Sequence, residues 1–190
     1  MSKKISLRYI VIFVLALPAA YIAIKQLLPY PHAKDLIIDI NSVIDSFHID
    51  THGIEYQTQI PQNGRLINEA SARYLSKNGG EIWQFIIQFE SCKQAAEKYS
   101  VIPDYEISNS WGYLPNVRSK SLIATQSKLS CYQSQDDLFP FTTCNYKALY
   151  EVYVVNIYES WSGHSQADNI ELLINKLDRK MLLLRKGCAR

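Results

Sequence analysis

Glycine is scarce in this sequence, with seven in 190 residues, and no glycine-rich motif of a nucleotide-binding or hydrolytic enzyme occurs. A phosphate-binding loop needs several glycines so that backbone N–H groups can approach the phosphate. The Gly-x-Ser-x-Gly elbow, which positions the nucleophile of many hydrolases, does not occur either. The sequence therefore gives no support to a nucleotide-dependent enzyme or to a serine hydrolase of that class.

Cysteine occurs four times, and no Cys-x-x-Cys pair of a zinc site or redox enzyme is present. In an exported chain, four cysteines favour disulfides, with three possible pairings if all are used. Cys131 and Cys144 lie at facing ends of a predicted strand pair, so they are the best candidates for a disulfide. Cys92 and Cys188 either pair with each other or stay free.

A continuous run of basic residues is also missing from the body of the chain. Residues 31–178 contain 11 Lys and Arg against 18 Asp and Glu, a net charge of −7, although the whole chain carries +2. Binding of nucleic acid needs a continuous basic face, so this partner class is excluded. Residues 187–190 are predicted to be a basic tail. The basic residues near this end are expected instead to solvate a helix end or to contact lipid headgroups, and they are Arg179, Lys180, Arg185, Lys186 and Arg190.

One long apolar run is present, from Tyr9 to Ile24, with three basic residues before it, which is the pattern of an export signal. Lys25 can extend toward the headgroups, and the leucines after it lengthen the helix to about 20 residues, enough to span a bilayer. We predict a transmembrane signal anchor, or uncleaved signal peptide, at 9–28, with residues 1–8 in the cytoplasm. Cleavage is the alternative, although the small-residue pattern for a peptidase is poorly met.

The rest of the chain is long enough for one domain with a real core. Residues 29–34 are predicted to be a linker, and residues 35–186 a domain outside the membrane, periplasmic if the cell is Gram-negative. We expect an α+β fold, with an antiparallel sheet of about five to six strands and helices packed mainly on one face.

The first half of this domain combines helical and alternating patterns. Apolar residues at helical spacing predict a helix from Asp35 to Phe47. Alternation with a period of two begins at Gly53, and segments 70–77 and 81–89 form a predicted hairpin across an Asn-Gly-Gly turn. Ser91 then begins a short helix in a capping-box pattern.

The second half ends in the strongest helical pattern of the chain. Strand character runs from Ser121 to Tyr132 and again, without a break, from Thr142 to Tyr158. The final helix is predicted to start at Ser165 or Asp168 and to bury a regular apolar stripe.

The sharpest candidate for chemistry is the group His48, Asp50 and His52, three possible metal ligands at alternate positions. In an extended segment such residues point to one side, so two imidazoles and a carboxylate could bind zinc or iron, with His164 as a fourth ligand. The alternative is that they are ordinary turn residues at a junction between a helix and a strand.

Two glutamates form a second, weaker candidate. Glu90 and Glu159 each end a predicted strand, and they would be close enough for acid–base chemistry if those strands were neighbours. The alternative is that each glutamate favours the positive end of a following helix. Neither pattern names an enzyme, and no cofactor is predicted.

Aromatic residues are frequent, with 13 Tyr and three Trp. Tyr and Trp are favoured at protein interfaces because they combine apolar area with a polar group. Alternatively, such residues fold back to close the ends of a sheet. The aromatic residues in predicted loops are Tyr105, Trp111, Tyr113, Phe139, Phe141 and Trp161.

The sequence as a whole favours a non-catalytic, membrane-anchored protein that binds another envelope protein as an accessory, assembly or immunity-type domain. Two alternatives come from other classes. One is a small metal-dependent enzyme that uses His48, Asp50 and His52, and the other is a small-molecule binding module with a pocket under the loops. Metal analysis of the purified protein beside a His48→Ala/His52→Ala variant separates the first alternative from the rest.

Overall fold

The computed structural model describes residues 16–18, 20–21, 23–24, 29–40, 47–59, 67–76, 80–101, 111–114, 120–134, 141–162, 168–184 and 186–188. The chain divides into two compact units, Met1–Pro31 and His32–Arg190. In the first unit, the described residues between 16 and 24 are helical. No helix in these described ranges is long and apolar enough to cross a membrane. Most of the predicted anchor at 9–28, and all of residues 1–8, lie outside them.

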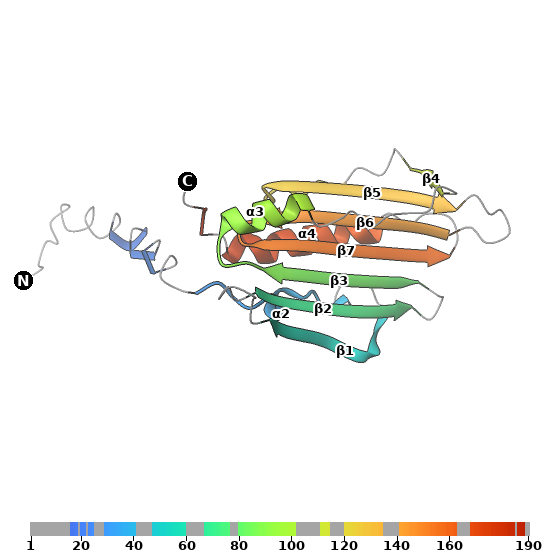
Figure 1. Ribbon diagram of the computed structural model, residues 1–190, viewed down its shortest axis with the longest axis horizontal. Helices are drawn as coiled ribbons and strands as arrows, with labels where there is room; N and C mark the ends of the chain where they lie inside the picture. The colour runs from blue at the N-terminus through green and yellow to red at the C-terminus, as the bar shows by residue number, and fades with distance from the viewer. Residues whose placement is uncertain are drawn as a thin grey trace, which may run out of the picture. The chain divides into compact units, whose positions relative to one another are not determined.

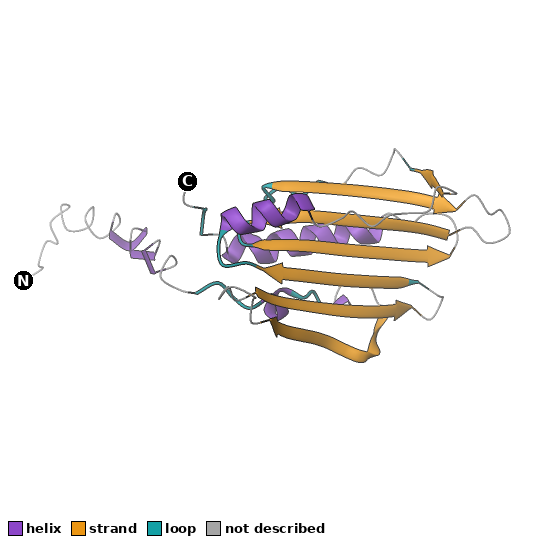
Figure 2. Cartoon of the chain, in the orientation of Figure 1, coloured by secondary structure: helices purple, strands orange, loops and turns teal. Residues whose placement is uncertain are grey.

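The second unit is built on one antiparallel sheet, which has seven strands among the described residues (Figures 1 and 2). The strand order is β1-β2-β3-β7-β6-β5-β4, so the sequence-distant strands β3 and β7 pair at its centre. The predicted α+β class is confirmed, with at least one strand more than expected. The strands are β1 (Phe47–Gln59), β2 (Ile67–Ser76), β3 (Glu81–Gln88), β4 (Trp111–Tyr113), β5 (Gln126–Ser134), β6 (Phe141–Tyr150) and β7 (Tyr153–Ser162).

The helices of this unit lie on both faces of the sheet (Figure 1). The short helix α2 (Ala33–Leu36) contacts α4 (Asp168–Leu184), and we call the face that they cover the inner face. Helix α3 (Cys92–Val101) covers one end of the opposite face, which we call the open face. The expectation that helices pack mainly on one face therefore holds for α2 and α4 but not for α3.

Helix α4 supplies much of the core on the inner face. It begins at Asp168, one of the two predicted starts. An apolar stripe of this kind drives a helix onto a sheet because burial of each large side chain contributes about 1.5–3 kcal/mol. The buried apolar residues of α4 recur at helical spacing and are Ile170, Leu173, Ile174, Leu177 and Met181.

The predicted helix from Asp35 to Phe47 is not continuous, and residues 41–46 of this range lie outside the described residues. The helix ends at Leu36, and the last residue of the predicted range already belongs to β1. The backbone of Ile38 bonds to side chains of the sheet instead: its N–H donates to Gln84 Oε1 (2.9 Å), and its carbonyl accepts from Gln84 Nε2 (2.6 Å) and the Tyr74 hydroxyl (3.0 Å). These bonds satisfy a buried, non-helical backbone, so the apolar residues are buried without continuing the helix.

The predicted single strand from Thr142 to Tyr158 is a hairpin. Strands β6 and β7 pair from Tyr150 and Tyr153 outward, which leaves a connection of only two residues. The first of these, Glu151, has φ 50°, a left-handed conformation that is uncommon for a residue with a side chain. Because no Gly, Asn or Pro marks the turn, the strand pattern continues through it unbroken.

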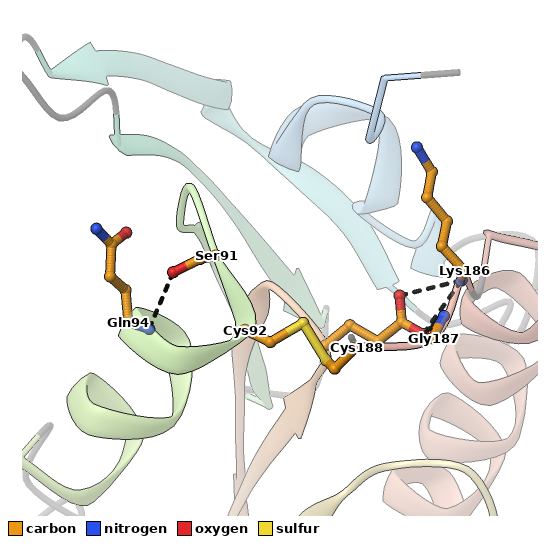
Figure 3. The surroundings of a disulfide bond; sticks show 7 residues. Ser91, Cys92, Gln94, Lys186, Gly187 and Cys188 are labelled. Atoms are coloured by element: carbon orange, nitrogen blue, oxygen red, sulfur yellow. Dashed lines mark hydrogen bonds between the residues drawn. A yellow bond between two sulfur atoms is a disulfide. The ribbon is translucent and has the colours of Figure 1, made fainter. Parts of the chain in front are cut away.

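The turn at Glu151 also binds the C-terminal segment of the chain. Figure 3 shows this segment at Lys186, Gly187 and Cys188. Its carboxylate accepts hydrogen bonds from the backbone N–H of Lys186 (3.1 Å to each oxygen) and of Gly187 (2.6 Å). The next residue, Cys188, forms a disulfide with Cys92 at the start of α3. The segment predicted as a basic tail is therefore covalently attached to the domain through Cys188.

A second disulfide joins β5 to β6, between Cys131 and Cys144. The two residues lie directly opposite each other within their strands, and both are buried. This is the pair that the sequence favoured, although the residues lie inside the strands rather than at their ends. The two bonds use all four cysteines, as fits a domain in an oxidising, extracytoplasmic compartment.

A buried carboxylate on α4 organises polar contacts on the inner face. Asp178 accepts hydrogen bonds from the hydroxyls of Ser121 (2.6 Å) and Tyr150 (2.7 Å) and from the backbone N–H of Leu122 (2.8 Å). The Tyr150 and Tyr146 hydroxyls are 2.9 Å apart. Burial raises the pKa of Tyr146 to about 12, so its hydroxyl stays protonated at neutral pH. The network joins α4 to β6 and to the segment before β5.

Candidate functional site

The predicted metal ligands lie in a strand rather than at a junction between a helix and a strand. His48, Asp50 and His52 belong to β1, whose pairing with β2 shifts register between Ile49 and Ile54. A bulge of this kind interrupts the regular alternation that would place the three residues on one side. Their side chains and His164 lie outside the described parts of the structure, so the metal site stays a prediction.

Four of the six aromatic residues predicted in loops lie in strands. Trp111 and Tyr113 form the short strand β4, while Phe141 begins β6 and Trp161 lies near the end of β7. The pairing register brings these strand ends together at one end of the sheet: the N–H of Phe141 donates to Ser134 Oγ (2.9 Å), and Ser134 pairs with Trp111. Tyr105 and Phe139 lie outside the described residues.

The predicted acid–base pair does not form. Strands β3 and β7 are neighbours, as the hypothesis required, but they are antiparallel, and Glu159 pairs with Ile82 near the start of β3. Glu90 follows the other end of β3, eight residues further along. At about 3.3 Å per residue, the backbone of Glu90 therefore lies roughly 26 Å along the strand direction from the backbone of Glu159.

The open face carries a small hydrophobic cluster where α3 covers it. Buried Phe89, Ala95, Leu149 and Val154 form this cluster, with Ile87 and Tyr99 packed against it. Away from α3, the same face of β3 presents Trp83, which is 50% exposed. An exposed tryptophan within a strand is unusual, because its large apolar area normally packs in a core or an interface.

The side chain of Trp83 is part of a fixed group of three. Arg73 lies opposite it on β2, with its guanidinium carbon 5.5 Å from the centre of the indole ring, a cation–π geometry. The Nε of Arg73 donates to Glu81 Oε1 at 2.6 Å. Because both side chains are partly exposed, this ion pair contributes little to stability, but it orients the guanidinium beside the ring.

Trp83 and Arg73 belong to a larger surface, which we call the open-face patch. Its members face the same side because they are cross-strand partners or occupy alternate positions of β2, β3 and β7. All except Trp83 are half-buried. The open-face patch consists of Ser71, Arg73, Trp83, Phe85, Asn156 and Tyr158.

The open-face patch can make contacts, but its described side chains offer no nucleophile with an adjacent base. It combines aromatic area with an arginine and small polar groups, the composition found at the centre of protein interfaces. The sequence pattern places Trp83 and Phe85 on one face of a strand. It does not reveal that α2 and α4 cover the other face, where Ile82, Gln84 and Ile86 are buried.

Comparison with known proteins finds similarity in fold and none in sequence family. No protein-family model and no curated protein matches the chain. The fold is similar to the crystal structure of the extracellular domain of PknH from Mycobacterium tuberculosis, with a TM-score of 0.50 and 8% identity over 80% of this chain and 97% of that chain. A second similar structure is an uncharacterised protein of Mycobacterium smegmatis, the Rv0999 ortholog, with a TM-score of 0.42 and 8% identity over 84% and 99%. At 8% identity, the likeness to the PknH domain shows the fold alone.

Proposed function

We propose that this chain is a membrane-anchored extracytoplasmic protein whose domain binds another envelope protein through the open-face patch, and that it acts by binding rather than by catalysis. Two disulfides support the location outside the cytoplasm, because such bonds persist in oxidising compartments. The apolar run from Tyr9 to Ile24, with basic residues before it, supports an anchor at 9–28 with its N-terminus in the cytoplasm.

The exposed indole of Trp83 carries the proposal. Covering the exposed half of such a ring, roughly 100 Å², contributes about 2.5 kcal/mol at ~25 cal/mol per Å². Because Arg73 is already oriented by Glu81, it loses little further freedom when a partner covers it. Arg73 and Glu81 place a positive and a negative charge beside the indole. This mixed charge favours a protein as the partner over a polymer whose charges all have one sign.

Site-specific crosslinking in native membranes tests the partner. A photo-reactive amino acid at Ser71, inside the open-face patch, is compared with one at Leu183, which is 75% exposed on α4. We expect a crosslinked protein from position 71 only. With that protein purified, Trp83→Ala weakens binding to the full-length chain at least tenfold, about 1.4 kcal/mol, and Leu183→Ala leaves it unchanged. Equal crosslinking from both positions, or unchanged binding by Trp83→Ala, contradicts the proposal.

The membrane topology is tested separately. Alkaline phosphatase fused after Arg190 is expected to be active, because the enzyme folds only in an oxidising compartment. The intact mass of the membrane-purified protein is expected to include residues 9–28. An inactive fusion overturns the orientation, and a mature protein that begins after this segment overturns the anchor.

A further inference from the structure

Two side chains on the inner face, near the end of β7, form a second group that is separate from the open-face patch. Glu159 and Trp161 occupy alternate positions of this strand, so they face the same side of the sheet. Their pairing partners on β6, Cys144 and Thr142, are fully buried. Glu159 is only 1% exposed, and the side chain of Asn169 on α4 hydrogen-bonds to it.

Each of these two residues has a buried polar atom that lacks a hydrogen-bond partner among the described residues. Neither Glu159 Oε2 nor Trp161 Nε1 has a hydrogen-bond partner in the part of the chain that the structure describes, and both atoms are buried. An unsatisfied buried donor or acceptor costs about 1–3 kcal/mol, and folded proteins contain few of them. Two such atoms, on side chains two residues apart on one face, indicate a binding site where a bound group supplies the missing hydrogen bonds.

The chemistry of the two atoms limits what can bind. An indole N–H only donates, so it repels a cation. Burial raises the pKa of Glu159 to about 8, partly offset by the hydrogen bond from Asn169, so its carboxyl is mostly protonated at neutral pH and can also donate. One oxygen with two lone pairs can accept from both residues.

We propose that Glu159 and Trp161 form a binding site for the acceptor oxygen of a small neutral molecule, either an internal water or the hydroxyl or carbonyl group of an organic ligand. Water needs two to four polar partners to be held inside a protein, and the two unpartnered atoms supply the minimum. An organic ligand would place its hydroxyl or carbonyl oxygen in the same position, between the Trp161 indole N–H and the Glu159 carboxyl.

NMR of the ¹⁵N-labelled, full-length protein in detergent micelles tests the site. The three indole N–H signals are assigned by replacing each tryptophan in turn. We expect the Trp161 indole proton to show a cross-peak either to a long-lived water or to ligand protons. The indole of the exposed Trp83 serves as the internal control, with rapid solvent exchange. Native mass spectrometry separates the two sources, because only an organic ligand adds its own mass.

Two variants show whether the two side chains hold the bound oxygen. Trp161→Phe removes one donor and is expected to lower occupancy at least tenfold. Glu159→Gln keeps a neutral side chain with an amide donor, so we expect it to retain the bound species. If the phenylalanine variant does not fold, Glu159→Gln is the variant in which occupancy is measured. A Trp161 indole with neither cross-peak overturns the proposal, and so does undiminished occupancy in a folded Trp161→Phe protein.

Discussion

At the scale of single residues, Glu159 makes the stability of the domain depend on pH. Burial raises its pKa from 4.5 to about 8. Between these values, the unfolded chain has released a proton that the folded domain still holds. The free energy of unfolding therefore falls as pH rises through this window, by up to about 1.4 kcal/mol per pH unit, and levels off above pH 8.

The substitution Glu159→Gln removes this pH dependence because glutamine does not titrate. We expect urea unfolding at pH 5, 6.5 and 8 to show the difference between the variant and the unmodified protein growing in favour of the variant as pH rises. Glu171→Gln, at an exposed position of α4, is the matched control and keeps the original slope. If the curves of Glu159→Gln and the unmodified protein run parallel, the pKa of Glu159 is not raised.

The buried carboxylate of Asp178 is a second residue with a large expected effect. Asp178→Ala leaves the hydroxyls of Ser121 and Tyr150 and the N–H of Leu122 without their acceptor. We expect a loss of about 3 kcal/mol or more in the free energy of unfolding, measured by urea denaturation. Glu171→Ala on the exposed side of the same helix should stay within about 0.5 kcal/mol. A loss below about 1 kcal/mol for Asp178→Ala would contradict the network.

At the scale of elements, local patterns predict those segments whose contacts are local. The pairing of β2 with β3 follows from alternation and from the Asn-Gly-Gly sequence between them, and α4 follows from its apolar stripe. The Ser91 cap is also local, since its hydroxyl accepts from the N–H of Gln94 at 3.3 Å (Figure 3).

Elements determined by distant contacts could not be predicted in this way. The non-helical course at Ile38 depends on Gln84, 46 residues away, and no spacing rule contains that bond. The turn at Glu151 depends in part on backbone groups 35 and 36 residues away. The same reason applies to the candidate site: alternation identifies the two faces of β3, but only the packing of α2 and α4 decides which face stays open.

The turn between β6 and β7 gives a prediction at this scale. Glu151→Gly relieves the positive φ, worth about 1 kcal/mol, but loses charge-assisted hydrogen bonds worth about 1.5–3 kcal/mol. We expect a small net destabilisation and at least tenfold faster hydrogen exchange at the amides of Lys186 and Gly187. Glu151→Gln keeps an acceptor oxygen and should have a smaller effect. Unchanged exchange in Glu151→Gly would show that the carboxylate does not hold this segment.

At the scale of the whole domain, contacts between segments far apart in sequence hold the sheet together. Strands β3 and β7 join the hairpin of β2 and β3 to that of β6 and β7 at the centre. The disulfide between Cys92 and Cys188 then ties the end of the chain to α3 across 96 positions. Closing so long a loop removes conformational entropy from the unfolded chain, by an amount the chain-entropy account places at about 4.7 kcal/mol.

The two disulfides are expected to differ in their resistance to reduction, because a reductant must reach the sulfur atoms. Cys131 and Cys144 are buried under the inner-face core, whereas Cys188 is exposed and Cys92 half-exposed. Limited treatment of the folded protein with dithiothreitol, followed by alkylation and mass spectrometry, should open the Cys92–Cys188 bond at least ten times faster. The free energy of unfolding of the partly reduced protein should then be about 2–5 kcal/mol lower than that of the oxidised protein. Unfolding in urea before reduction provides the control, since both bonds then react at similar rates, and equal rates in the folded protein would refute the difference in access.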